Sequence, residues 1–229
     1  MKASIRKAKS EDITAIVKLH AEAFSGFFLS LMGAPFLREL YTGFLEDDLS
    51  ICLVSIEGEK VTGFVVGTTH PEKFFRSLLR SRWCYFGVRA VPGLMRHPIL
   101  VAQRVWTALS YRGEAPRRLN SGALLSSIGI SPQSAGQGIG RLLVEQFCEI
   151  AATKGARSVF LTTDRDNNEA VNGFYLKLGF TLEDSFLKHG TRHMNRYVKI
   201  ITAPISGELD NSERNLVEPR FTSAYFRER

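Results

Sequence analysis

The stretch SPQSAGQGIGRLL, residues 131–143, constrains the fold more than any other part of the sequence. It holds three glycines at alternate positions, Gly136, Gly138 and Gly140, directly before apolar residues at helical spacing. The preceding SGALLSSIGI has strand composition, and Pro132 ends that strand. A strand that enters a helix through glycines leaves backbone N–H groups free at the positive end of the helix dipole. The stretch therefore predicts a site for a phosphate or pyrophosphate group.

Residue type excludes two familiar phosphate-binding loops. A dinucleotide-binding turn has the spacing G-x-G-x-x-G and follows the first strand of its domain, whereas these glycines are spaced G-x-G-x-G and lie deep in the chain. A P-loop ends in Gly-Lys followed by Ser or Thr, whereas Gly140 is followed by Arg141 and Leu142. The turn is therefore expected to bind another class of phosphate compound; the alternative is a glycine-rich turn without a ligand.

Hydrophobic periodicity predicts alternating strands and helices around the glycine turn. Strands are expected over residues 3–8, 51–57, 60–69, 121–130, 156–163, 180–188 and 192–200. The first helix is expected to begin after Ser10, its N-cap, and a second to cover part of 34–46. A third is expected to run from the glycines to near Gly155. A fourth is expected to end at Gly179 and to carry an apolar stripe of Val171, Phe174, Tyr175 and Leu178.

Two motifs together resemble the GNAT superfamily of acyl-CoA-dependent N-acyltransferases. QSAGQG, residues 133–138, is similar to the family's Gln/Arg-x-x-Gly-x-Gly/Ala pattern, and NNEAVNGFYLKLGF, residues 167–180, is similar to its Asn followed by a helix ending Phe-Tyr-x-x-x-Gly-Phe. The resemblance covers roughly residues 3–70 and 121–200. It implies an α/β (α+β) fold with a mixed, mostly antiparallel sheet of six to seven strands, splayed in the middle, flanked by helices and carrying a helical insertion after the third strand.

The resemblance also implies a donor, acetyl-CoA, with CoA as product and no metal. Backbone N–H groups of the glycine turn would bind the CoA pyrophosphate, residues 128–130 would pair with the pantetheine chain, and Asn168 would bond the pantetheine or a phosphate. The implied donor-binding residues are Ile128, Gly129, Ile130, Gln133, Ser134, Ala135, Gly136, Gln137, Gly138, Ile139, Gly140, Arg141, Asn168 and Tyr175.

Tyr175 is the expected catalytic residue. Transfer of acetyl from a thioester to an amine needs a proton for the departing thiolate, and a phenol with a reference pKa of about 10 carries one at neutral pH. The alternative is a core tyrosine with a structural hydrogen bond. By resemblance, an N–H near Ile130 would stabilise the oxyanion.

A general base is missing from the expected place. Many relatives carry a glutamate on the strand before the pyrophosphate turn, whereas residues 123–130 contain no Asp or Glu. Deprotonating a lysine-like amine at pH 7 costs about 4.6 kcal/mol. An amino sugar has a less basic amine, so its deprotonation at pH 7 costs less free energy. The missing carboxylate therefore favours an amino sugar or a nucleotide-linked amino sugar as acceptor.

The segment from residue 20 to 37, HAEAFSGFFLSLMGAPFL, is unusually aromatic for a connection between helices. It resembles a stretch of acetyltransferases from cell-surface polysaccharide pathways. His20, Phe27 and Phe28 are therefore the candidate acceptor-binding residues. The alternative is plain core packing, which for His20 is the favoured interpretation.

Residues 72–118 are basic and aromatic, and we expect them to form a helical insertion. They hold ten of the 30 Lys and Arg residues but only two of the 23 Asp and Glu residues, whereas the whole chain has a net charge of +7. The segment could attract an anionic substrate, touch an anionic membrane surface or a protein, or form a solvated lid. No nucleic-acid motif accompanies the charge, so no nucleic-acid partner is expected.

Composition places the chain in the reducing cytoplasm. Its three cysteines are isolated, no apolar run reaches the ~20 residues of a membrane span, and the first residues lack the apolar stretch of a secretory signal. We expect one domain over residues 1–200 and a polar extension over 201–229, in a monomer or homodimer.

Four functions remain open at this level, the last of which is a peripheral membrane protein anchored by residues 72–118. The favoured one is an N-acetyltransferase acting on a small amine. The second is a protein or peptide N-acetyltransferase, with the basic insertion shaping a groove for an acidic chain. The third is a regulatory module that binds CoA without turnover: the missing glutamate supports it, whereas Tyr175 and the intact glycine turn oppose it.

Overall fold

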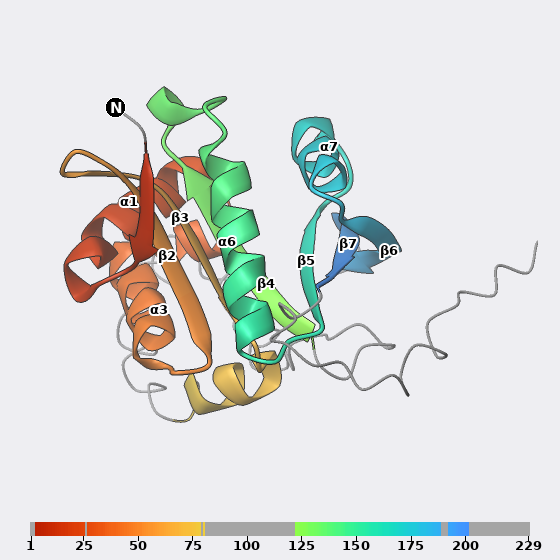
Figure 1. Cartoon of the computed structure of the whole chain (residues 1–229), viewed down its shortest axis with the longest axis horizontal. Helices are drawn as coiled ribbons and strands as arrows, with labels where there is room; N and C mark the ends of the chain where they lie inside the picture. The colour runs from red at the N-terminus through yellow and green to blue at the C-terminus, as the bar shows by residue number, and fades with distance from the viewer. Residues whose placement is uncertain (1–2, 26, 79, 81–121, 189–191, 202–229) are drawn as a thin grey trace, which may run out of the picture.

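Seven strands form one sheet in the computed structural model of the chain, which describes residues 3–25, 27–78, 80, 122–188 and 192–201 (Figure 1). The strands are β1 (Ser4–Lys7), β2 (Ser50–Glu57), β3 (Lys60–Thr68), β4 (Gly122–Ile130), β5 (Ser158–Asp164), β6 (Thr181–Lys188) and β7 (Arg192–Ile200). Their order is β1-β2-β3-β4-β5-β7-β6, and every neighbouring pair is antiparallel except β4 and β5. The predicted fold class, a mixed and mostly antiparallel sheet, is confirmed.

The helices lie on both faces of this sheet. They are α1 (Ile13–Ala23), α2 (Phe28–Leu31), α3 (Ala34–Glu46), α6 (Ile139–Thr153) and α7 (Glu169–Lys177), with 3-10 turns η1 (Ser10–Asp12) and η2 (Pro132–Ser134). None of the helices in the described part of the chain has the length and apolar character needed to cross a membrane.

The predicted insertion over 72–118 lies outside the described residues from residue 81 to its end. Its beginning is described: residues 71–78 are helical, and the Phe74 ring stacks on Phe44 of α3 with centroids 4.1 Å apart. The insertion therefore starts as part of the core. The predicted extension over 201–229 is described only at Ile201.

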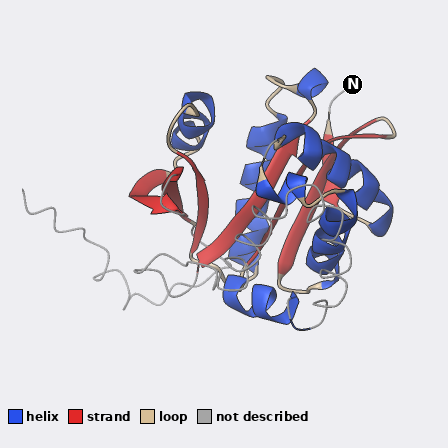
Figure 2. Ribbon diagram, turned by 180° about the vertical axis from the view of Figure 1, so that it is seen from behind, coloured by secondary structure: helices blue, strands red, loops and turns tan. Residues whose placement is uncertain are grey.

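Strands β1 to β4 are covered on both faces (Figures 1 and 2). On one face α6 packs through Leu143 and Phe147 onto Val65 and its neighbours. On the other face α1 and α3 pack onto alternate residues of the same strands, such as Phe64. The first six residues of β2 are all buried, because successive side chains enter opposite cores.

The sheet splays between β4 and β5. These parallel strands pair only where residues 122–124 face residues 158–160. Beyond that point β4 continues along β3 to Ile130, whereas β5 pairs with β7 as far as Asp164. The predicted splay in the middle of the sheet is thus confirmed, and residues 125–130 of β4 have no strand partner on their β5 side among the described residues.

A β-bulge in β4 reverses the direction of its side chains. Gly67 faces Leu125 and Val66 faces Ser127, so the register shifts by one residue at position 126. Before the bulge Leu125 packs in the α6 core, whereas after it Ile128 packs there. Alternation therefore turns Ser127 toward the side of α1 and α3.

The start of the first helix differs from the prediction. Ser10 lies inside the 3-10 turn η1, and the residue before that turn is Lys9. The carboxylate of Asp12 accepts the Lys9 N–H at 2.7 Å and both terminal nitrogens of Arg6 at 2.7 and 2.9 Å. Ser10 as N-cap was therefore wrong, because a buried aspartate at the end of the turn supplies the acceptor instead.

Candidate active site

The glycine turn between β4 and α6 adopts left-handed backbone angles. Gly136 has φ 77° and Gly138, the N-cap of α6, has φ 80°. A Cβ built on either residue would meet nothing within 4 Å. Glycine is thus favoured here by backbone conformation rather than by protein packing, and the space in front of the turn is open to a ligand.

Six consecutive backbone N–H groups of this turn are available. Those of residues 136–141 have no backbone partner among the described residues, and Leu142 is the first to donate into the helix, to Gly138 O at 3.1 Å. The N–H groups of Ser134 and Ala135 donate within η2, at 2.9 and 3.3 Å. The prediction that those two donors face the ligand is therefore corrected, because the 3-10 turn uses them.

The side chains of the turn mostly bond one another. The Ser131 hydroxyl donates to Gln133 Oε1, Gln137 Nε2 donates to the Gln133 carbonyl at 3.4 Å, and Arg141 pairs with Glu145 at 2.7 Å. Ser134 and Ile139 are buried and anchor the turn. What the turn offers a ligand is therefore mainly its backbone.

The unpaired edge of β4 leads into this turn. Ile128 and Ile130 are half-buried against the α6 core, and Gly129 and Gly140 lie against the rings of Phe64 and Phe174. An extended chain that pairs with this edge would end at the free N–H groups beyond Gly136. The arrangement fits the pantetheine and pyrophosphate of a CoA molecule, which a strand-like edge and a helix N-terminus can bind.

Asn168, predicted to bond CoA, closes the turn between β5 and α7. Its Nδ2 donates to Thr163 Oγ1 at 2.9 Å and to Asp164 O at 3.0 Å. The backbone carbonyl of Asn168 accepts hydrogen bonds from the backbone N–H of Asn172 at 2.9 Å and from Asn172 Nδ2 at 2.8 Å. Both amide hydrogens of Asn168 are thus used within the protein, which leaves Oδ1 as its side-chain group for a ligand.

Tyr175 is buried on α7. Its ring contacts those of Phe174, Phe180 and Tyr197, the last nearly parallel at 6.2 Å. Burial raises the pKa of the Tyr175 phenol above its ordinary value. The group therefore keeps its proton throughout the neutral range, as a donor to a thiolate must.

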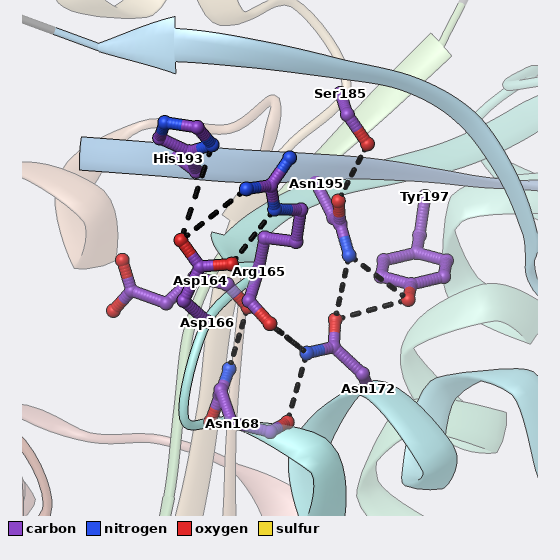
Figure 3. A network of polar contacts seen from close by, with 9 residues as sticks. All are labelled: Asp164, Arg165, Asp166, Asn168, Asn172, Ser185, His193, Asn195 and Tyr197. Atoms are coloured by element: carbon purple, nitrogen blue, oxygen red, sulfur yellow. Dashed lines mark hydrogen bonds and ion pairs between the residues drawn. The ribbon is translucent and has the colours of Figure 1, made fainter. Parts of the chain in front are cut away.

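A polar network holds α7 to β7 (Figure 3). Asn172 Oδ1 accepts the Tyr197 hydroxyl at 2.9 Å and Asn195 Nδ2 at 3.2 Å, while Asn172 Nδ2 donates to the carbonyls of Asp164 and Asn168. The Ser185 hydroxyl donates to Asn195 Oδ1 at 2.7 Å. Helix α7, which carries Tyr175, is thus fixed by a hydrogen-bonded frame.

Aromatic and charged side chains connect α1 to β7. The rings of His20 and Phe24 are 4.7 Å apart, those of Phe24 and Phe27 5.6 Å, and the Arg192 guanidinium lies 4.6 Å from the Phe27 centroid. Arg192 forms a two-point ion pair with Asp164 at the end of β5. Phe27, predicted to border the acceptor, is 39 % exposed; the side chain of Phe28 lies outside the described part of the structure.

His20 is buried at 2 % exposure, as a core residue would be. Its Nδ1 lies 2.6 Å from the Tyr41 hydroxyl of α3, and Nε2 is buried without a partner. Burial lowers the pKa of His20 to about 4, so the ring is neutral at pH 7.

Sequence reasoning missed Tyr41, Ser127, Asp164 and Arg192 as members of this region. Tyr41 was one aromatic residue in an expected helix, and Ser127 was one of two adjacent serines in an expected strand. The bulge in β4 turns Ser127 toward the side of α1 and α3, which local sequence does not reveal. No described group of three or more His, Cys, Asp or Glu residues is placed to hold a metal.

A sequence model of the acetyltransferase (GNAT) family matches residues 13–180. The chain belongs to the GNAT family. A relative, the mycothiol acetyltransferase of Arthrobacter sp. (strain FB24), is 35 % identical over 66 residues, which are 29 % of this chain and 20 % of that protein. This chain thus aligns with only one fifth of that relative's length.

Solved GNAT structures share the fold at low identity. The ribosomal-protein-S18-alanine N-acetyltransferase from Escherichia coli superposes with a TM-score of 0.55 at 13 % identity, covering 91 % of this chain and 100 % of its own. A spermidine N-acetyltransferase chimera from Vibrio cholerae gives 0.55 at 16 % identity, covering 87 % and 96 %. These similarities support the architecture described above.

Proposed function

We propose that this GNAT protein is an acetyl-CoA-dependent N-acetyltransferase that moves acetyl directly to the amine of a small acceptor, with an amino sugar or a nucleotide-linked amino sugar favoured. The observation that carries the proposal is the continuous donor surface: the unpaired edge of β4 followed by the free N–H groups of residues 136–141. A bound thioester would supply the acetyl group.

The chain contributes binding, orientation and a proton to this reaction. The N–H groups of 136–141 would bind the pyrophosphate, and the edge at 128–130 would orient the thioester. A backbone N–H near Ile130 would stabilise the oxyanion. The amine nitrogen would bond to the thioester carbonyl carbon as the carbon–sulfur bond breaks, and would release a proton to solvent. Tyr175 would give its phenolic proton to the departing thiolate and regain one from solvent.

The acceptor side supports a small, weakly basic amine. Residues 123–130 contain no carboxylate that could take a proton from a strongly basic amine. The ring of Phe27, with Arg192 and Asp164 beside it, combines an apolar surface with groups that can bond hydroxyls. Such a mixture suits a sugar better than an extended polyamine.

An acceptor panel tests this assignment. CoA release is measured with glucosamine, a uridine-diphosphate amino sugar, spermidine and a peptide with an N-terminal alanine. We expect one of the two amino sugars to give the highest kcat/KM. Fastest turnover with spermidine or the peptide would reject the amino-sugar assignment while keeping the transferase.

The second candidate is a CoA-binding module without turnover, which the lack of a carboxylate on residues 123–130 favours. Calorimetry with acetyl-CoA, combined with the acceptor panel, separates the two candidates. Tight acetyl-CoA binding without release of CoA in the presence of any of the four amines would support the module. Turnover with any of them would reject it.

The cytoplasmic location is part of the same proposal. Cys52 and Cys148 are free and buried. Burial raises the pKa of these thiols to about 12 and about 11, so both are protonated and unreactive. Thiols of this kind are compatible with a reducing compartment.

Gly138→Val tests the turn. A side chain at φ 80° strains the backbone by roughly 1–2 kcal/mol and fills the space in front of the N–H groups. We expect acetyl-CoA affinity to fall at least tenfold in calorimetry. Gly155→Val is the matched control, because Gly155 has φ 84°, equally open surroundings and a place at the other end of α6. Equal losses of affinity in both variants would reject the proposed pyrophosphate site.

Tyr175→Phe tests the proton donor. Removal of the hydroxyl should lower kcat by about 10²-fold, the usual contribution of a general acid, without changing acetyl-CoA affinity. Tyr197→Phe, which removes a buried hydroxyl bonded to Asn172, is the control for stability. If Tyr175→Phe keeps full turnover, Tyr175 is a core residue only.

A further inference from the structure

The side chain of Arg192, at the start of β7, is held on two sides. Its Nε and Nη2 donate to the two carboxylate oxygens of Asp164 at the end of β5. Its guanidinium carbon lies over the Phe27 ring, 4.6 Å from the centroid, a distance at which a cation and an aromatic face attract each other. The guanidinium is therefore fixed both in position and in plane.

Both partners of this guanidinium are themselves anchored. The backbone carbonyl of Asp164 accepts hydrogen bonds from Nδ2 of Asn168 and from Nδ2 of Asn172, each at 3.0 Å, within the network of Figure 3. The Phe27 ring packs edge-on against the ring of Phe24, with centroids 5.6 Å apart. A side chain that is already ordered loses little conformational entropy when it binds a ligand, which favours affinity.

The ion pair uses only part of the guanidinium. Of its five N–H groups, the bonds to Asp164 take one on Nε and one on Nη2. The other three, two on Nη1 and one on Nη2, have no hydrogen-bond partner in the described part of the chain. The Arg192 side chain is 32 % exposed, so a ligand can reach them. One N–H on each terminal nitrogen thus remains as a fork of two parallel donors.

An anionic group with two oxygens matches this fork. Phosphates and carboxylates accept two parallel N–H groups of an arginine, and such charge-assisted pairs are among the stronger hydrogen bonds. Asp164 lies on a different edge of the guanidinium, so the positive group stands between its carboxylate and a bound anion. The neighbouring Arg165 is paired with Asp166 at 2.8 Å. Selectivity therefore comes from the fork of Arg192 rather than from a general excess of positive charge.

The contact between Arg192 and Phe27 joins the two sides of the splay. Asp164, which holds Arg192, ends β5 beyond the last residue that pairs with β4. Phe27 follows α1, and α1 packs against β4. The fork therefore lies where the two sides of the sheet have separated, which is where an acceptor must enter to reach a thioester held along β4.

We propose that Arg192 is a specificity-determining residue whose fork binds an anionic group of the acceptor, a phosphate or a carboxylate, and that Phe27 is a positioning residue that fixes the plane of the guanidinium. The inference rests on the proposed function, because it narrows the acceptor of that reaction from an amino sugar to an amino sugar that carries a negative charge.

Kinetics on four related acceptors test the contact: glucosamine, glucosamine 6-phosphate, muramic acid and the uridine-diphosphate amino sugar. Glucosamine has no anionic group, muramic acid carries a carboxylate and the other two carry phosphate, so the panel separates the two kinds of anion. The variants are Arg192→Lys, which keeps the charge without the fork, and Phe27→Leu, which removes the ring. Arg165→Lys is the matched control, because Arg165 is an exposed arginine directly after β5 that pairs with Asp166.

The readout is the ratio of kcat/KM between the best anionic sugar and glucosamine, because partial unfolding would lower both values alike. For the wild type this ratio should be about tenfold or more. Arg192→Lys should lower it about tenfold, and Phe27→Leu about threefold, since a cation–π contact at an exposed site is weaker. Arg165→Lys should leave it within about twofold of the wild-type ratio. Thermal melts report folding, and Phe27→Leu, which keeps the ion pair, carries the test if Arg192→Lys is unfolded.

The inference is overturned if no anionic sugar exceeds glucosamine with the wild type, or if Arg192→Lys lowers kcat/KM for glucosamine and for the anionic sugar by the same factor. If the wild type acetylates none of these sugars, the proposed amino-sugar acceptor fails and this inference falls with it. The two failures are distinguishable, because the first leaves the turnover of glucosamine in place.

Discussion

The two sides of the splay differ in what holds them together. The first, here called the platform, comprises β1 to β4 with α1, α3 and α6; the second, called the arm, comprises β5 to β7 with α7. In the platform, the first six residues of β2 are all buried between two apolar cores. In the arm, the first five residues of β6 are exposed, and β7 and α7 meet through an amide network.

This difference in packing predicts that the platform is more rigid than the arm. The platform carries the glycine turn on close-packed elements, which suits groups that must hold a fixed geometry. The arm carries Tyr175 and joins β4 through only three residue pairs. The splay is thus the junction with the fewest paired residues in the described sheet, while Tyr175 of the arm packs in the same apolar core as Phe147 of α6.

The largest expected effect is on the platform core. Phe147 of α6 is 0 % exposed, so Phe147→Ala should lower the free energy of unfolding by roughly 3–5 kcal/mol. Leu187→Ala, which shortens a 53 % exposed residue of β6, should change it by about 0.5 kcal/mol or less. Denaturant titration measures the free energy of unfolding of both variants. Similar losses in the two variants would show that the platform and the arm do not differ in packing.

The second effect depends on pH. His20 has a folded-state pKa of about 4, below the value of ~6.5 expected for an unfolded chain. The unfolded state therefore binds the extra proton first, and stability falls as pH drops from 6.5 toward 4, by roughly 3 kcal/mol in total. Above pH 6.5 this residue contributes no pH dependence.

His20→Gln is expected to flatten that part of the stability curve, measured by urea titration between pH 7 and pH 4. An unchanged curve would mean that the His20 ring is solvated rather than buried. The arm offers a contrast in exposure, since the His193 side chain on β7 is 43 % exposed.

The smallest effect is expected from the arm's network. Asn172→Ala removes an amide that bonds three backbone carbonyls and accepts from Tyr197, so it should cost roughly 1–3 kcal/mol. Hydrogen exchange should rise in β5, α7 and β7 but not in the platform. Gln146→Ala, at an exposed amide of α6, is the control. Exchange that rises equally on both sides would show that the two sides unfold together.

Local patterns predicted most of the fold. The glycine turn could be predicted because a strand, a proline and three glycines are adjacent in sequence. The hairpin of β2 and β3 could be predicted because Gly58 joins two apolar runs. Gly179 ended the last helix as expected, with φ 80°. The seven strands followed from the residue patterns, whereas the splay followed from the family resemblance rather than from periodicity.

Contacts between distant segments could not be predicted. Ser127 faces the side of α1 and α3 only because of a bulge opposite Gly67, where a Cβ would lie 2.0 Å from the Leu124 carbonyl oxygen. Helical spacing likewise grouped Val171 with Tyr175, yet Val171 is 39 % exposed whereas Tyr175 is buried. Such details depend on packing partners that the sequence does not specify locally.

The unpaired stretch of β4 also bears on aggregation. Exposed strand edges recruit other chains, and proteins usually guard them with charges, prolines or bulges. Residues 125–130 contain no charged residue and no proline. The features that protect this edge from pairing with another chain are the single bulge and the arm beside it. A donor paired along this edge would occupy it, so saturating acetyl-CoA should slow heat-induced precipitation by an amount that light scattering can follow.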